Sequence, residues 1–279
     1  MLVDKPKGLT SNDVVNEIRR VYHLKKVGHA GTLDPLATGL LVVGLGKATR
    51  LFEYLKSNKT YVAEITLGAT SETLDSEGPI VKNDKYAEKG IREVKDALET
   101  FKGKQEQIPP VHSAIKINGQ AAYKRTRNNE KLEMKSRQVE FFQIELLDYK
   151  DDVVKIQVEV SAGTYIRSLA RDIGEKLGTG AYMSNLQRIK SGDFDISNAM
   201  SLEDIQQEKE PTKLLIPIEK GVSHLPKIEA DEEMWLKVIH GQTFGSKTDG
   251  NLAQIWHKEK LIAIAIKTDG LWQPNKVLV

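Results

Sequence analysis

The chain has 279 residues, of which 29% are charged, and its formal net charge is only +2. This length is sufficient for one large domain and a smaller one, each with its own hydrophobic core. Because the sequence contains no cysteine, disulfides, thiolate nucleophiles and cysteine-ligated zinc are excluded, and a reducing cytoplasm is the expected compartment.

Membrane and metal signals are also missing from the sequence. No apolar run approaches the ~20 residues that a membrane span needs. The first ten residues, MLVDKPKGLT, lack the basic, apolar and small-residue order of a signal peptide. The six histidines are scattered without HxH or HxxxH pairs, so no metal and no cofactor are expected.

The first hundred residues contain both helical and strand patterns. A helix is predicted after Thr10, because Thr10-x-x-Asp13 resembles a capping arrangement and apolar residues follow at helical spacing. The later elements predicted here are an apolar run over 40–45, a helix over 47–56, a strand over 60–67 and a helix over 91–101.

Residues 104–137 interrupt this pattern and are predicted to form an inserted segment. They contain Pro109-Pro110 and Asn118-Gly119, and the second pair predicts a small hairpin. Residues 102–137 hold nine Lys or Arg and three Glu, a balance of +6. Such a basic stretch is typical of a polyanion-binding patch, and equally of a solvated loop with ordinary surface lysines.

The second half continues the mixture of strands and helices. Strands are predicted over 139–149 and 153–160, and a helix over 164–177 with Thr164 as its N-cap. Because strands and helices do not alternate strictly, the pattern favours an α+β fold with a mixed sheet. After a linker near 210–224, short strands predict a small, mostly β terminal domain over 224–279.

Asp34 is the residue whose position most needs explanation. It lies in VGHAGTLDPLATGLL and is the only acid between Glu17 and Glu53. Asp34-Pro35 is consistent with an ordinary turn. A carboxylate in apolar surroundings is also suited to act as a nucleophile, provided that a cation keeps it ionised. A glycosidase would need a second carboxylate, which this stretch does not supply.

Two other positions show a similar choice between structure and function. In SAGTYIRSLARDIG, Arg167 lies in the first helical turn, where it opposes the helix dipole and therefore needs a partner. That partner is either a functional acid elsewhere or the neighbouring Asp172. Tyr61 is expected either to pack in the core or to stack on an unpaired base.

Taken together, these segments resemble the TruB family of tRNA pseudouridine synthases. The resemblance runs through most of residues 2–220, in five ordered motifs. They are VDKPKGLTSNDVV, GHAGTLDPLATG, QIPPVHSAIKINGQAAY, GTYIRSLARDIG and AYMSNLQRIKSGDF. The resemblance implies an isomerase that converts the T-loop uridine of tRNA, at position 55, to pseudouridine.

The resemblance also implies roles for particular residues. Asp34 would be the nucleophile, Arg167 its ion-pair partner, and Tyr165 a contact to the base and a candidate for proton transfer at C5. Tyr61 would stack on the flipped uracil and Leu186 would form a wall of its pocket.

Further residues would contact the RNA or lie near the site. His29 would hold the rearranged loop of the RNA, and Lys5 matches a lysine near the family's active site. The basic insertion, 104–137, would grip the T-arm, with contacts expected from Lys124, Arg125 and Arg127.

The family pattern divides the chain into a catalytic domain over 1–220 and a PUA-like RNA-binding domain over 224–279. The expected partner is the T-arm stem-loop of tRNA, with no membrane and no obligate protein partner. Two other functions remain open: a tRNA-binding folding chaperone with dispensable catalysis, and a sugar-processing hydrolase with a second carboxylate beside Asp34.

Overall fold

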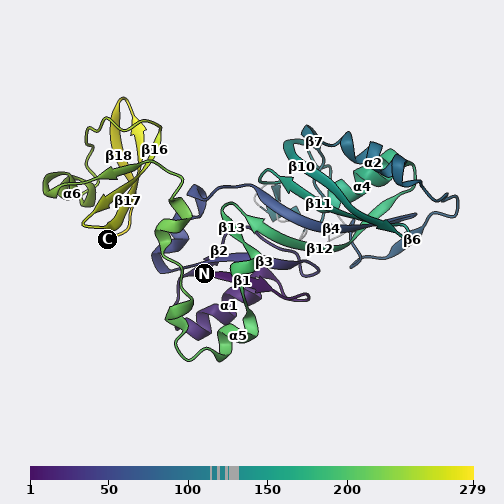
Figure 1. Cartoon of the computed structure of the whole chain (residues 1–279), viewed down its shortest axis with the longest axis horizontal. Coiled ribbons are helices and arrows are strands. Elements are labelled where there is room, and N and C mark those ends of the chain that lie inside the picture. The colour runs from purple at the N-terminus through teal and green to yellow at the C-terminus, as the bar shows by residue number, and fades with distance from the viewer. Residues whose placement is uncertain (114, 118–119, 123–124, 126–131) are drawn as a thin grey trace.

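The computed structural model describes residues 1–113, 115–117, 120–122, 125 and 132–279 (Figure 1). Within these residues ten strands form one mixed sheet. In spatial order its main strands are β14 (Met200–Ser201), β1 (Leu2–Lys5), β3 (Thr38–Leu45), β12 (Ala181–Ser191), β4 (Lys59–Leu67), β11 (Val153–Val160), β10 (Arg137–Lys150) and β7 (Gly103–Gln107). The short β2 (Val27–His29) pairs with β3, and β13 (Phe194–Asp195) pairs with β12.

The order of the strands confirms the predicted α+β class. β1 pairs with β14 and β3 pairs with β12 in parallel, whereas the other main pairs are antiparallel. The single parallel contact between β3 and β12 joins the sheet's two halves at its middle. Residues near 38 and near 188, distant in the sequence, therefore meet there.

Two helices cover the sheet on the side of β4, β10 and β12. α2 (Ile91–Glu99) packs on α4 (Ile166–Leu177), and α4 packs on β12 and β4 (Figure 1). Alternate residues of β4 and β11 are buried beneath them, as expected for strands with one face in the core. The core that results extends to Leu33 and Leu36, which flank Asp34 in the sequence.

A second layer lies against β1, β2 and β3. α1 (Ser11–Tyr22) begins with a capping box in which Thr10 accepts from the Asp13 amide and Asp13 accepts from the Thr10 amide. This confirms the predicted helix start. The buried face of α1 packs with β1 and with α5 (Leu202–Gln207), which lie next to it in Figure 1.

The C-terminal residues form a separate four-stranded sheet with its own core. Its strands are β15 (Lys227–Glu229), β16 (Leu252–His257), β17 (Lys260–Thr268) and β18 (Leu271–Val277), accompanied by α6 (Glu232–Ile239). The segment before it contains two short 3₁₀ helices, η3 (Pro211–Leu214) and η4 (Ile218–Val222). The small sheet contacts the rest of the molecule at the 3₁₀ helix η1 (Gly46–Tyr54), where Asn275 donates to the Tyr54 hydroxyl.

The remaining short elements lie near the edges of the main sheet. β5 (Ala69–Ser71) pairs with β6 (Ile80–Lys82), and η2 spans Ile196–Asn198. Within the insertion, β8 (Lys116–Ile117) pairs antiparallel with β9 (Gln120–Ala121). This pairing confirms the predicted hairpin, whose turn at Asn118-Gly119 lies outside the described residues.

Two predicted elements differ in detail. The helix expected over 47–56 is present as the 3₁₀ helix η1 (Gly46–Tyr54), in which the Thr49 hydroxyl donates to the Gly46 carbonyl three residues back. The N-cap of α4 is Tyr165 instead of Thr164. The Thr164 hydroxyl donates to the Ser161 carbonyl, and the Gln107 side chain accepts from the Tyr165 amide in its place.

Gly174 should be the least replaceable residue of α4. A Cβ built on Gly174 would lie 2.3 Å from the backbone nitrogen of Ala181, and backbone atoms cannot move aside cheaply. We expect Gly174→Ala to lower the free energy of unfolding by about 2–3 kcal/mol, measured by urea denaturation. Glu175→Ala, on the exposed face of the same helix, should change it by less than ~0.5 kcal/mol. Equal effects of the two would contradict close packing at Gly174.

Candidate active site

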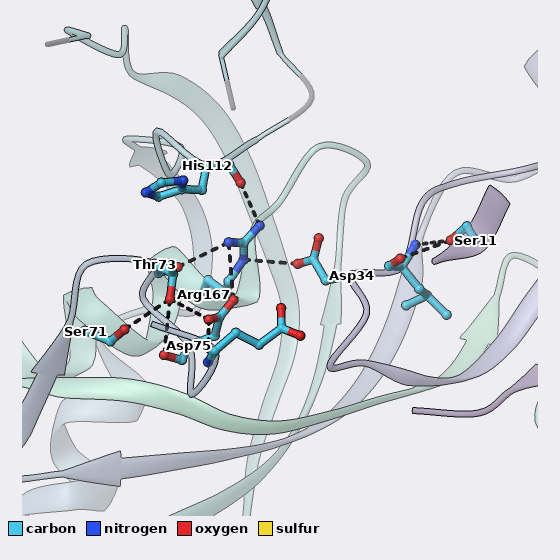
Figure 2. A network of polar contacts seen from close by, with 9 residues as sticks. Ser11, Asp34, Ser71, Thr73, Asp75, His112 and Arg167 are labelled. Carbon is cyan, nitrogen blue, oxygen red and sulfur yellow. Dashed lines mark hydrogen bonds and ion pairs between the residues drawn. The ribbon is translucent and has the colours of Figure 1, made fainter. Parts of the chain in front are cut away.

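The loop that carries Asp34 joins β2 to β3 and is held in place by hydrogen bonds to its backbone. Ser11, at the start of α1, accepts from the Leu33 amide at 2.8 Å and donates to the Leu33 carbonyl at 3.0 Å (Figure 2). The Ala37 amide donates to the Asp34 carbonyl, which closes a turn. The turn predicted from Asp34-Pro35 is therefore present, and it presents the carboxylate.

Two buried cations, Lys5 and Arg188, lie beside this loop and bind backbone carbonyls. Lys5 is fully buried and donates to the carbonyls of Pro6 and Leu9, with a longer contact of 3.5 Å to that of Pro35. Arg188, from β12, is 1% exposed and donates to the carbonyls of Leu40 and Gly31 at 2.7 and 3.1 Å. Both cations bind neutral carbonyls, so neither is paired with the Asp34 carboxylate.

Asp34 forms an ion pair with Arg167 in the first turn of α4. Nε of Arg167 lies 3.1 Å from Oδ2 of Asp34, outside the alignment of a hydrogen bond. The arginine side chain is 7% exposed and the aspartate 34%, so the carboxylate remains accessible. The partner predicted for Arg167 is thus an acid distant in the sequence. Asp172, the alternative, pairs with Arg171 instead.

Arg167 is fixed by three further partners (Figure 2). Its Nη1 donates to the Thr73 carbonyl at 3.2 Å, and its Nη2 donates to the His112 carbonyl at 3.0 Å. Its Nη1 also lies 3.4 Å from Oδ2 of Asp75, whose side chain is 3% exposed. One guanidinium therefore joins the Asp34 loop, the turn after β5 and the base of the insertion.

Asp75 is the residue that the sequence analysis missed. Its Oδ1 accepts from the Thr73 hydroxyl at 2.6 Å and from the Glu77 amide at 3.0 Å. The stretch around Asp34 supplies no second carboxylate, but the fold brings Asp75 to the same arginine. Asp75 nevertheless faces Arg167 and is hydrogen-bonded on its other oxygen, so it is not placed as the free second carboxylate of a hydrolase. No sequence spacing links residues 34, 75 and 167, and only the fold brings them together.

Burial and nearby charges decide the protonation of the site. Burial raises the pKa of Asp34, and Asp75 raises it further, while Arg167 and Lys5 lower it. Burial also lowers the pKa of Lys5 to about 8, against the attraction of Asp34. The pKa of Glu77 is raised by burial, Asp75 and Asp34. The site thus gathers three carboxyl groups, of which Asp34 is paired directly with the arginine and partly exposed.

Aromatic and apolar side chains surround this charged centre. Tyr61, on β4, is 9% exposed and belongs to the same core cluster as Leu33, Leu36 and Leu186. Of the two roles expected for Tyr61, packing in the core therefore accounts for most of its surface. Tyr61 lies opposite Arg188 in the pairing of β4 with β12.

Tyr165 is held by its backbone at the start of α4. The Gln107 side chain accepts from the Tyr165 amide at 2.8 Å and donates to its carbonyl at 3.1 Å. The guanidinium of Arg137 lies 4.9 Å from the centre of the Tyr165 ring. Because Arg167 follows two residues later, the same clamp helps to set the direction of the arginine.

The other predicted residues lie at the edge of the site or beyond it. His29 is on β2, half-buried, and its pKa is lowered by burial and by Arg188. Arg125 is described and partly exposed, whereas Lys124 and Arg127 lie outside the described residues. In the described part of the chain, no group of three or more His, Asp or Glu side chains is placed to hold a metal ion. No helix of that part is long and apolar enough to cross a membrane.

Burial and the neighbouring Asp75 predict a measurable rise in the pKa of Asp34. In a ¹³C NMR titration of labelled aspartates, Asp34 should titrate above the ordinary 3.8, and Asp75→Asn should lower its pKa by removing a like charge. Asp13 provides an internal control, because hydrogen bonds from Thr10 should hold its pKa below 3.8. A wild-type Asp34 that titrates with Asp13 would contradict this account.

Comparison with known proteins places the chain in a family. Residues 19–166 match the model of the TruB family pseudouridylate synthase N-terminal domain, and residues 167–223 match that of the tRNA pseudouridylate synthase B C-terminal domain. The tRNA pseudouridine synthase B of Dehalococcoides mccartyi (strain BAV1) is 40% identical, over 99% of this chain and 95% of the relative. That of Oenococcus oeni is 38% identical, over 100% and 97%.

Solved structures give the same result. The chain resembles a protein in a Cbf5-Nop10-Gar1 complex with a TM-score of 0.76 and 30% identity, covering 99% of this chain and 83% of the other. A chain of an H/ACA RNP bound to a substrate RNA containing 2′-deoxyuridine matches with a TM-score of 0.75 and 28% identity, over 99% and 84%. The chain therefore belongs to the TruB family of tRNA pseudouridine synthases, which are isomerases.

Proposed function

We propose that the chain converts the T-loop uridine of tRNA, at position 55, to pseudouridine, with Asp34 as the nucleophile. The observation that carries this proposal is the Asp34–Arg167 ion pair of 3.1 Å, in which a buried arginine faces a carboxylate that is still 34% exposed. A nucleophilic carboxylate must be ionised and reachable, and this pair supplies both conditions.

The proposed reaction rearranges bonds within one nucleotide. The Asp34 carboxylate attacks uracil C6 or ribose C1′, and in either route the C1′–N1 bond breaks. The base then turns and a C1′–C5 bond forms. The bond between Asp34 and the nucleotide breaks and returns the free carboxylate, and C5 loses its proton while N1 gains one. Atoms and electrons balance without an oxidant or a reductant, and Tyr165 is the proposed group for the proton transfer at C5.

The base must leave the RNA stack before it reaches Asp34. Extruding a base costs roughly a few kcal/mol, and phosphate contacts from the basic insertion would offset that cost. Tyr61 would then stack on the uracil, Leu186 would form a wall of its pocket, and His29 would hold the rearranged loop of the RNA. Lys5 would act by positioning the Asp34 loop, since its ammonium is buried against carbonyls.

The C-terminal sheet is proposed to be a PUA-like module that adds RNA contacts. Residues 224–279 hold seven Lys or Arg and seven acids, so charge alone gives this unit little attraction for RNA. Lys227 lies 4.3 Å from the ring centre of Trp256, which places one cation beside an aromatic surface. The larger share of T-arm binding is therefore assigned to the insertion, residues 104–137, with its Lys124, Arg125 and Arg127.

Release of tritium from uracil C5 tests the chemistry directly. A T-arm hairpin labelled at C5 of the target uridine should lose tritium with wild-type protein and should retain it with Asp34→Asn, because the amide cannot act as the nucleophile. Binding of the same hairpin by both proteins serves as the control for folding. Binding without release by wild type would favour the chaperone instead, and release by Asp34→Asn would remove Asp34 from the mechanism.

Arg167→Lys should separate charge from geometry. The ammonium keeps the positive charge but cannot reach Asp34, Asp75 and two carbonyls together, so kcat should fall by about a hundredfold or more while the fold is retained. Arg171→Lys, one turn later in α4, is the matched control and should stay within about threefold of wild type. Near-normal turnover of Arg167→Lys would contradict the role of the planar guanidinium.

A further inference from the structure

A group of basic side chains lies at the edge of the site, around Gly31. A Cβ built on Gly31 would lie 3.5 Å from Nη1 of Arg188 and 3.6 Å from Cε of Lys59. Lys59 is the first residue of β4 and precedes Tyr61 by two positions, so both side chains leave the same face of the strand. His29 lies two residues before Gly31, on β2.

This cluster, consisting of His29, Lys59 and Arg188, has no acidic partner. In the described part of the chain none of the three forms an ion pair with Asp or Glu, and Arg188 is bound to carbonyls. Burial and Arg188 lower the pKa of Lys59 to about 8, with no carboxylate opposing them. Unpaired charge in a half-buried position is costly, and an anionic ligand would offset that cost.

Lys59 is also positioned to contact a ligand from solution. Gly31, beside which its side chain lies, is exposed, as is Thr32. The ammonium has three N–H donors, and its hydrogen bond within the described structure goes to the Ser57 carbonyl at 3.1 Å. This bond is made to the same short segment, so a second acceptor can be bound without breaking the contacts of the Asp34 loop.

We propose that Lys59 binds one backbone phosphate of the RNA, adjacent to the nucleotide whose base stacks on Tyr61, and that Arg188 strengthens the local positive potential from beneath. This inference rests on the proposed function, since it names a contact for the same substrate. Two residues of a strand span about 6.6 Å, so a phosphate at Lys59 and a base at Tyr61 belong to the same or to neighbouring nucleotides. The contact would fix the backbone on which the base turns.

Salt dependence of binding gives the first test. Lys59→Gln should weaken binding of the T-arm hairpin by about tenfold, and it should reduce the slope of log K against log salt by about 0.7–0.9, as expected for one lost phosphate contact. Lys59→Arg should restore most of the slope because it keeps the charge. Lys56→Gln is the matched control, since Lys56 is exposed and paired with Asp193 at 2.7 Å.

Neutral linkages in the RNA give the second test, which identifies the phosphate. In a series of hairpins that each carry one methylphosphonate near the target uridine, wild type should lose affinity at one position, and Lys59→Gln should lose nothing more at that position. The proposal is overturned if Lys59→Gln is as sensitive as wild type at every position, or if Lys56→Gln reproduces its change in slope. Wild-type tritium release is measured separately, so a failure of the isomerase proposal is distinguishable from a failure of this contact.

Discussion

The guanidinium of Arg167 is the group on which the arrangement of the site depends. It faces Asp34 and Asp75 and donates to the carbonyls of Thr73 and His112. A buried cation needs all of these partners, because each unpaired N–H in a dry environment carries a desolvation cost. Four segments distant in the sequence are therefore fixed relative to one another by one side chain.

The division of work between the two aspartates follows from this arrangement. Asp75 is buried, hydrogen-bonded on Oδ1 and held toward the arginine, so it orients and compensates the charge. Asp34 is partly exposed and has the arginine on one side only. Two carboxylates thus share one cation, and its attraction lowers the pKa of Asp34 in surroundings where burial raises it.

The rest of the site is held by cations that bind neutral groups. Lys5 binds the carbonyls that follow β1 and reaches that of Pro35 at 3.5 Å, and Arg188 binds those of Leu40 and Gly31, so both fix backbone near Asp34 without pairing with its carboxylate. Preorganised groups of this kind lower the reorganisation that accompanies a reaction. The positive charge that Lys59 and Arg188 add at the edge of the loop also matches a polyanionic substrate, whose phosphates would otherwise be repelled by three carboxyl groups.

The sequence by itself determined most of the secondary structure and two residues of the charged centre, Asp34 and Arg167. Helical spacing and the Thr10–Asp13 cap predicted α1, and alternation predicted β4, because these signals are local. The strands β10 and β11 were also predicted from the sequence. Asp34 and Arg167 stood out because each carries a charge in a context that disfavours it. The 3₁₀ form of η1 was not predicted, since the sequence indicated a helix over 47–56 without its hydrogen-bond spacing.

Only the tertiary structure decided which acids meet Arg167, that Asp75 is one of them, and that Lys59 lies over Gly31. The physical reason is that these contacts join residues far apart in the sequence, from 28 positions for Gly31 and Lys59 to 133 positions for Asp34 and Arg167. Local propensity carries no information on such distances, and the pairing of β3, β12 and β4 sets them.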